Sequence, residues 1–262
     1  MRFAPRPLNP PLRDWRGRAV WLVGASSGIG LATARALHAA GAKVALSARG
    51  QARLAAACAG LPGSLALQAD VTRPGELRAA FAQLHAQWGA PALVLYCAGR
   101  WEPLHASALS AAALREHMEV NYLGATQLLE VVLPTLLAAG CGHVSLMASV
   151  AGYRGLPKAL AYGPTKAALN NLAEILYLDL HDRGLGVSVI NPGFVDTPMT
   201  AGNDFAMPAL MQPDAAARAI LAGWAAGRYE MHFPRRFTLL MKLLRHLGER
   251  SYFFAVRRVT QP

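Results

Sequence analysis

The stretch GASSGIG at residues 24–30 decides the fold class of this chain. It follows the short apolar run AVWLV at 19–23 and precedes an Ala-rich helical pattern over about residues 29–40. A diphosphate needs glycine at such a turn, because side chains would keep it away from the backbone N–H groups that begin a helix. The sequence therefore predicts a phosphate-binding strand–helix turn. A tight turn that only allows close helix packing is the structural alternative.

Short apolar strands alternate with helical patterns beyond this turn. Apolar runs lie at 43–48, 64–70, 92–99, 143–149 and 187–193, with helical stretches between them. This alternation is typical of βαβ units, in which parallel strands are covered by helices on both faces. Because such crossovers are right-handed, we expect a single α/β domain with a doubly wound parallel sheet.

The two ends of the chain differ from residues 18–232, which are expected to form the dinucleotide-binding domain. Residues 1–17 are rich in Pro and Arg and are expected to form an extended arm that adds nothing to the core. Residues 233–262 form a basic tail in which seven Lys/Arg stand against one Glu. As a helix over 237–250, the tail places Phe237 and five leucines on one arc and its charged residues on the other. Such a helix suits a peripheral contact with an anionic membrane, and packing on its own domain or on a subunit partner is the alternative.

The composition narrows the classes of protein. Hydrophobic residues make up 53% and charged residues 16%, which indicates a folded globular chain. The N-terminus has no secretory h-region and no uninterrupted apolar run reaches transmembrane length, so we expect a cytoplasmic protein that is membrane-peripheral at most. The net charge is +11, yet the first 230 residues hold no basic block interleaved with aromatics, so no nucleic-acid partner is expected. Three widely spaced cysteines (58, 97 and 141) indicate a reducing compartment and no metal site.

Further motifs follow the first along the chain, and the full order is GASSGIG at 24–30, Asp70-Val71, Cys97-Ala98-Gly99, Asn121, Ser149, Tyr162-xxx-Lys166, Asn191-Pro192-Gly193 and Thr197. In this order, over about residues 18–230, they resemble the short-chain dehydrogenase/reductase family. The resemblance implies one Rossmann-type domain with about seven strands, a nicotinamide cofactor, and a homodimer or homotetramer. Val23 and Cys97 depart from the pattern, which usually has Thr and Asn there, and both positions mainly hold the turn and the central sheet.

The resemblance also implies a set of cofactor contacts, with Asp70 placed against the adenine. The expected contacts are Gly24, Ser26, Ser27, Gly28, Ile29, Gly30, Ser47, Arg49, Asp70, Val71, Ala98, Gly99, Tyr162, Lys166, Pro192, Gly193, Val195 and Thr197.

The end of the second strand bears on the choice of coenzyme. NAD sites usually place an acid there to bind the ribose 2′-OH, and this chain reads Leu-Ser-Ala-Arg at 46–49 instead. Arg49 can pair with a 2′-phosphate and Ser47 can add a hydrogen bond, so NADP(H) is favoured over NAD(H). The alternative is that Arg49 is a solvated loop charge.

The expected catalytic residues are Asn121, Ser149, Tyr162 and Lys166. Tyr162 and Lys166 are four residues apart, so a helix places them on one face. We expect the ammonium to lower the phenol pKa from its usual value near ~10 and so to suit proton exchange with a substrate oxygen. Ser149 ends the fifth strand, where it can polarise a carbonyl. By resemblance Lys166 also holds the nicotinamide ribose, and Asn121 anchors a water that relays protons.

The function predicted on these grounds is hydride transfer between NADP(H) and a carbonyl or alcohol substrate, with Tyr162 as the acid/base. The segment 197–211 holds three Met, one Phe and one Leu, which suggests an apolar substrate pocket unless these residues pack only on protein. A non-catalytic NADP-binding sensor or scaffold is the main alternative, although it would not need Tyr162 or Lys166. Sugar-nucleotide epimerases usually have a longer C-terminal region, and a serine hydrolase would need a GxSxG elbow where this chain reads MASVA.

Overall fold

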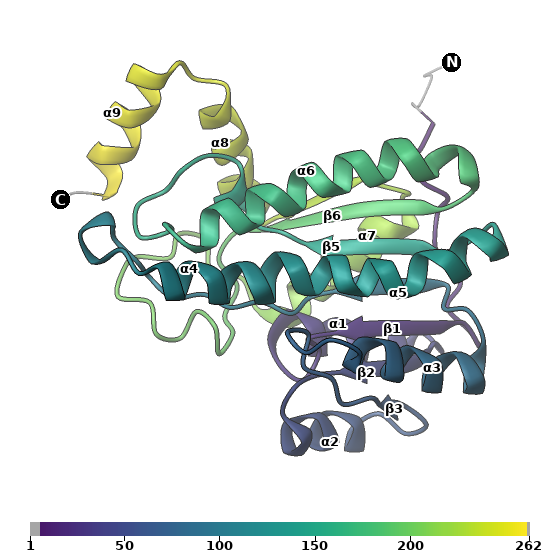
Figure 1. Ribbon diagram of the computed structural model, residues 1–262. Coiled ribbons are helices and arrows are strands. Elements are labelled where there is room, and N and C mark those ends of the chain that lie inside the picture. The colour runs from purple at the N-terminus through teal and green to yellow at the C-terminus, as the bar shows by residue number, and fades with distance from the viewer. Residues whose placement is uncertain (1–5, 261–262) are drawn as a thin grey trace.

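A seven-stranded parallel sheet forms the centre of the computed structural model, which describes residues 6–260 (Figure 1). The strand order is β3-β2-β1-β4-β5-β6-β7, and every neighbouring pair is parallel. The strands are β1 (Ala19–Val23), β2 (Lys43–Ser47), β3 (Leu65–Ala66), β4 (Leu93–Tyr96), β5 (His143–Met147), β6 (Gly186–Pro192) and β7 (Glu230–Phe233). The order reverses between β1 and β4, which is the switch point where ligands bind in open α/β sheets. The predicted doubly wound sheet is confirmed.

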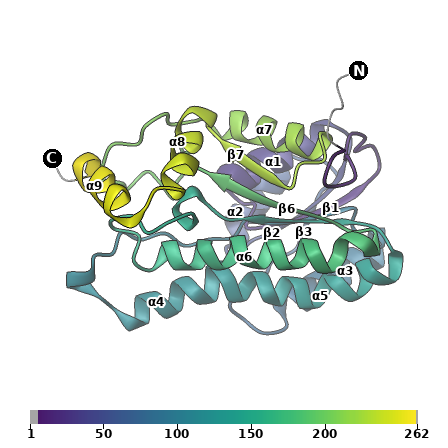
Figure 2. The same cartoon turned by 90° about the horizontal axis from the view of Figure 1, so that it is seen from above.

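Helices cover both faces of this sheet (Figure 2). One face is packed by α1 (Gly28–Ala39), α2 (Gln51–Ala59) and α7 (Pro213–Ala225). The other is packed by α3 (Glu76–Trp88), α5 (Gly124–Ala139) and α6 (Tyr162–Leu180). A short helix, α4 (Ala111–Met118), continues into α5 through one π-helical turn, Glu119–Leu123.

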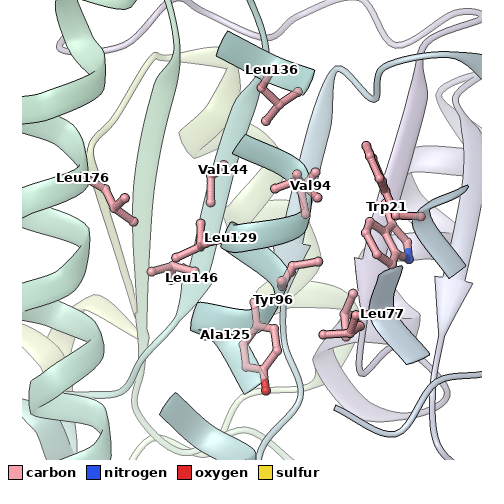
Figure 3. Close-up of a cluster of buried hydrophobic side chains, with 14 of the residues drawn as sticks. Trp21, Leu77, Val94, Tyr96, Ala125, Leu129, Leu136, Val144, Leu146 and Leu176 are labelled. Atoms are coloured by element: carbon pink, nitrogen blue, oxygen red, sulfur yellow. The ribbon is translucent and has the colours of Figure 1, made fainter. Parts of the chain in front are cut away.

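Alternation along the strands supplies apolar side chains to both layers. In β1, Trp21 and Val23 point toward α3 and α5, whereas Val20 and Leu22 point toward α1 and α7. Figure 3 shows part of the layer between the sheet and α3, α5 and α6, where Trp21, Val94 and Leu129 lie in one apolar cluster. A sheet that is buried on both faces needs strands that are apolar almost throughout. The strands could therefore be predicted from apolar runs in the sequence.

The helix Ala111–Ala139 is the one stretch within residues 6–260 that is long and apolar enough to cross a membrane. Its second half is α5, whose Leu128, Val132 and Leu136 are buried against the sheet. We therefore interpret it as a core helix of the domain.

The N-terminal arm contributes to the core, contrary to expectation. Leu12 and Trp15 are buried, and the Trp15 ring packs edge-on against Trp224 of α7. Asn9 is buried too, and its side chain bonds both the N–H and the carbonyl of Val187 at 2.9 and 2.8 Å. The expectation was wrong because the polar, Pro-rich composition of the arm does not indicate which of its residues face the domain. Asn9, Leu12 and Trp15 do so. The first five residues of the predicted arm lie outside the described part of the chain.

The basic tail forms two helices, so the single helix expected over 237–250 is wrong. The first, α8, spans Arg235–Arg245, and the second, α9, spans Glu249–Thr260. The break falls at His246–Gly248: His246 caps the end of α8, and the Gly248 carbonyl accepts the first hydrogen bond of α9, from the Tyr252 N–H at 3.0 Å. Phe233, expected to begin the tail, is the last residue of β7. The third strand is also shorter than the predicted run at 64–70.

Candidate active site

The turn between β1 and α1 brings the glycine motif to the carboxyl edge of the sheet. The N–H groups of Gly24 and Ala25 both donate to the Ser47 carbonyl, at 2.7 and 3.2 Å. Gly24 has a φ of +86°, and a Cβ there would lie 2.3 Å from the backbone N of Ala98. A Cβ on Gly30 would lie 2.7 Å from the Gly24 carbonyl. These two positions therefore require glycine because neighbouring backbone fills the space of a side chain.

The N-terminus of α1 suits an anion. No side chain caps it in the described structure, and its first turn carries no acidic residue. Ser26, Ser27 and Ile29 of the turn are partly exposed. The Thr197 side chain lies 3.1 Å from the place of a Cβ on Gly28, so it covers the turn from the other side of the site. Free N–H groups and a helix dipole fit the diphosphate of a dinucleotide.

Of the two residues expected to contact a 2′-phosphate, Ser47 lies in the core and Arg49 lies at the surface. Ser47 is fully buried, and its hydroxyl accepts a hydrogen bond from the Trp21 indole at 2.9 Å. Its side chain therefore faces the core, and the expected contact with a 2′-phosphate is wrong, because β2 alternation turns this position inward. Arg49, two residues later, is exposed at the carboxyl end of the strand.

Asp70 lies close enough to Arg49 for the two charges to interact. Its carboxylate accepts hydrogen bonds from the Thr72 N–H at 3.0 Å and the Thr72 hydroxyl at 2.7 Å. Burial would raise the pKa of Asp70, but the two Thr72 bonds and the Arg49 charge lower it on balance. The next residue, Val71, is buried, and a Cβ on Gly124 would lie 2.9 Å from its Cβ. The Asp70 carboxylate is thus held in one orientation by Thr72, at the edge of the sheet where a cofactor is expected.

Ser149, Tyr162 and Lys166 meet beyond the end of β5. Tyr162 is the first residue of α6, and one turn later the Lys166 Nζ lies 5.4 Å from the centroid of the Tyr162 ring. Lys166 is buried and donates to the Met147 carbonyl at 2.7 Å. The Ser149 hydroxyl accepts from the Ala151 N–H at 3.1 Å, which holds it in place next to Tyr162.

The pKa values in this group differ from the expectation. Burial raises the pKa of Tyr162 to about 12, and the Ser149 hydroxyl opposes this rise. Burial also lowers the pKa of Lys166 to about 8. The expected lowering of the tyrosine pKa by lysine is wrong for this structure, because the ammonium points at the Met147 carbonyl and stands over the ring rather than the phenol oxygen. At neutral pH Tyr162 is therefore a protonated phenol.

Asn121 sits in the π-helical turn and is fully buried. Its amide donates to the Thr165 hydroxyl at 2.9 Å and to the Arg100 carbonyl at 3.0 Å, and its oxygen accepts from the Arg100 N–H at 2.6 Å. The Thr165 hydroxyl in turn donates to the Tyr162 carbonyl at 2.7 Å. Asn121 thereby ties the π turn, a feature common at functional sites, to the first turn of α6. Its part in a water relay stays a prediction, since protein groups already occupy its amide.

The remaining predicted cofactor residues line the same edge. Gly99 lies under Asn121 and Lys166, whose Oδ1 and Nζ are 3.6 and 3.8 Å from the place of its Cβ. The Gly193 N–H donates to the Phe233 carbonyl at 2.7 Å, which joins the loop after β6 to β7. Ala98, Pro192 and Val195 complete this edge, with Val195 bridged to Met211 of the following segment.

Three aromatic contacts at the site have no counterpart among the sequence-based predictions. The Trp101 ring stands edge-on to the Tyr162 ring, and its indole N–H donates to Asn203 at 2.8 Å. Trp101 thus joins Tyr162 to the segment that follows Thr197. On the opposite side, Phe194 packs against both Phe205 and Phe237, with ring centroids 5.9 and 5.3 Å apart. No local pattern marks these residues, because their partners lie far away in the sequence.

Comparison with known proteins identifies the family. The model of the short chain dehydrogenase family matches residues 18–206. An uncharacterized oxidoreductase of Myxococcus xanthus is 32% identical over 247 residues, which is 92% of this chain and 97% of that protein. The Danio rerio protein named dehydrogenase/reductase SDR family member 7B is 30% identical over 202 residues, which is 73% of this chain and 64% of that protein.

Solved structures share the same architecture. The structure titled "Crystal structure of gox2181" superposes with a TM-score of 0.75 at 20% identity, covering 86% of this chain and 96% of that one. A ribose-5-phosphate isomerase from Brucella melitensis superposes with a TM-score of 0.77 at 24% identity, covering 84% and 91%. At these identities the likeness shows the fold alone. With the family model and the sequence relatives, it follows that this chain belongs to the short-chain dehydrogenase/reductase family of nicotinamide-dependent oxidoreductases.

Proposed function

We propose that this oxidoreductase transfers a hydride between NADP(H) and a carbonyl or alcohol substrate, with Tyr162 as the acid/base. The observation that carries the proposal is the convergence of Ser149, Tyr162 and Lys166 beside the uncapped N-terminus of α1. Chemistry at a carbonyl needs a proton source next to a place where a cofactor can lie, and both meet at this sheet edge.

Each residue has one task in the reduction. The cofactor, when bound, supplies the hydride to the carbonyl carbon, and the Tyr162 phenol gives its proton to the carbonyl oxygen, so that the alcohol forms. Ser149, held by the Ala151 N–H, places its hydroxyl beside that oxygen. Lys166 carries positive charge near the tyrosine and is placed to hold a ribose hydroxyl. The reverse reaction runs through the same groups, with the phenolate accepting the proton.

The proposed preference for NADP(H) rests on Arg49. It is exposed at the carboxyl end of β2, where no acid stands that would repel a 2′-phosphate. Its charge acts on Asp70, the residue proposed to contact the adenine, which supports a place for the guanidinium beside the proposed adenine site. A bidentate bond from arginine to phosphate is strong and specific.

The proposed substrate is apolar. Met199 is exposed beside Gly99, with its methyl carbon 3.4 Å from the place of a Cβ there, so it borders the expected nicotinamide position. Phe194 and Phe205 form an aromatic wall on the side of α8. Thioether and aromatic side chains suit an apolar molecule of variable shape.

The test measures carbonyl reduction and coenzyme binding in the same protein preparation. NADPH oxidation is measured with a panel of aldehydes and ketones for the native protein and for Tyr162→Phe, and NADPH and NADH binding are measured by fluorescence. We expect turnover to fall by orders of magnitude in Tyr162→Phe while NADPH binding is kept. If the native protein binds NADPH and turns over no carbonyl, the non-catalytic sensor replaces this proposal.

Arg49→Asp tests the coenzyme assignment, and Arg35→Asp on the exposed face of α1 is its matched control. Loss of attraction and added repulsion should reverse the preference toward NADH in the first variant only. Equal affinity of the native protein for both coenzymes contradicts the assignment.

We also propose a homodimer or homotetramer in a cytoplasmic location. Ile175 and Leu178 are exposed on α6, where a second subunit can cover them. Cys58, Cys97 and Cys141 are all free thiols, as is usual in a reducing compartment. Light scattering after gel filtration gives the subunit number, and a monomer at all concentrations contradicts the oligomer.

A further inference from the structure

The two tail helices expose an unusual amount of apolar surface. Of the twelve large apolar side chains that are exposed within residues 6–260, six lie between residues 239 and 259. They are Leu239, Leu240, Leu243, Phe253, Phe254 and Val259. A cluster of this kind marks a surface that is covered by something else in function.

One side of each helix is firmly bound to the domain, so the exposed sides are not the result of a detached tail. In α8, Thr238 and Met241 are buried, and Lys242 forms an ion pair with Glu230 of β7. In α9, Tyr252 is buried, its hydroxyl donates to the Gly155 carbonyl at 2.7 Å, and the Arg154 guanidinium lies 3.8 Å above its ring. Figure 1 shows both helices beside the N-terminal end of α6.

The opposite side of α9 combines aromatic rings with cations. Arg250, Phe253, Phe254, Arg257 and Arg258 line one shallow hollow of the surface. Their spacing of three, four, seven and eight residues places them on one face of the helix. On α8, Arg236 precedes the exposed leucines by one turn. Arginine heads and apolar side chains on the same face are typical of helices that lie in a membrane interface.

The positive charge of this surface favours an anionic binding partner. Apart from Lys242, which is paired with Glu230 on the bound side, the tail carries six Arg and one Glu, a net charge of +5 within a chain of +11. In a two-fold contact between copies of this chain, two such surfaces would face and repel each other. We propose that the exposed faces of α8 and α9 dock on an anionic lipid surface. The rings enter the headgroup boundary, and Arg236, Arg250, Arg257 and Arg258 pair with phosphates.

Docking there has a consequence for the active site. Phe237 of α8 packs on Phe194, and its ring carbon lies 2.7 Å from the place of a Cβ on Gly193. The loop that borders the proposed substrate site is therefore in direct contact with the lipid-binding helix. A lipid-dissolved substrate would reach that loop directly. This step rests on the proposed function, whereas the lipid contact does not.

The test measures binding without catalysis. The full chain is sedimented with vesicles of phosphatidylcholine alone or with about 30% phosphatidylserine. We expect binding to the anionic vesicles only, and its loss when salt rises from about 0.1 M to about 1 M. Arg257→Gln/Arg258→Gln should weaken binding roughly thirty-fold, and Phe253→Ser/Phe254→Ser should weaken it at least tenfold. Leu8→Ser in the N-terminal arm removes an exposed apolar side chain outside the tail and should leave binding unchanged.

Three results would overturn the proposal. One is that the native protein sediments with neither vesicle, and another is that it sediments equally with both. The third is that the tail variants, shown by circular dichroism to be folded, bind vesicles normally but sediment as smaller particles. In that case a second copy of the chain covers the surface.

Discussion

The Trp101 indole stands edge-on to the Tyr162 ring, with centroids 5.1 Å apart and an interplanar angle of 77°. The same indole donates a hydrogen bond to Asn203 in the segment after Thr197. One side chain therefore orients the proposed proton donor and anchors the segment that borders the substrate.

This arrangement predicts two different effects at Trp101. Trp101→Ala removes both contacts, and kcat/KM should fall roughly tenfold, the size of an aromatic pair of about 0.5–1.5 kcal/mol. Trp101→Phe keeps a ring against Tyr162 but loses the bond to Asn203, so KM should rise with kcat kept. Steady-state kinetics with one carbonyl distinguish the two. Equal behaviour of both variants would show that the bond to Asn203 alone matters, because both variants lose it, and native behaviour of Trp101→Phe would show that the ring alone matters.

The raised pKa of Tyr162 predicts opposite pH profiles for the two directions. With a pKa of about 12, Tyr162 is a protonated phenol at neutral pH, the form that donates a proton during reduction. The reduction rate should stay level as pH rises and fall only when the phenol ionises, whereas the oxidation rate should rise with pH. Initial rates in both directions between about pH 6 and 10 check this. A reduction rate that already falls as pH rises from about 7 to about 9 contradicts the raised pKa of Tyr162.

The buried Lys166 predicts a stability change at alkaline pH. Its folded pKa of about 8 lies below the value of 10.5 in the unfolded chain, so the unfolded state binds more protons between these values. The native protein should therefore gain stability, on the order of 2–3 kcal/mol relative to Lys166→Met, as pH rises from about 8 to about 10.5. Urea unfolding at several pH values measures the difference. Lys43→Met, at an exposed position, is the control, and parallel curves for native protein and Lys166→Met would refute the shift.

The Asn9 bonds predict that the N-terminal arm stabilises the domain. Asn9→Ala would leave the N–H and carbonyl of Val187 buried without their partner, which should cost about 2–4 kcal/mol of unfolding free energy. Arg13→Ala, which removes an exposed hydrogen bond to the Ala225 carbonyl, should cost about 0.5 kcal/mol or less. Urea unfolding of both variants gives the comparison. Similar costs would place the arm outside the cooperative unit.

Sequence alone determined the features that depend on neighbours along the chain. The phosphate-binding turn could be predicted from the glycines at 24–30, because a tight turn into a helix leaves no room for a Cβ at such positions. Tyr162 and Lys166 were legible because helical periodicity brings residues four apart together. The alternation of buried strands and helices likewise indicated the parallel sheet, since each segment carries its own period.

Tertiary structure decided what depends on surfaces that meet across the fold. It turned the Ser47 hydroxyl inward to Trp21, placed Trp101 against Tyr162, and buried Asn9 beside Val187. It also set the charge state of Tyr162, because burial outweighs a lysine that faces another acceptor. These outcomes depend on partners far away in sequence, and a pattern of neighbouring residues carries no information about which distant groups will be brought into contact.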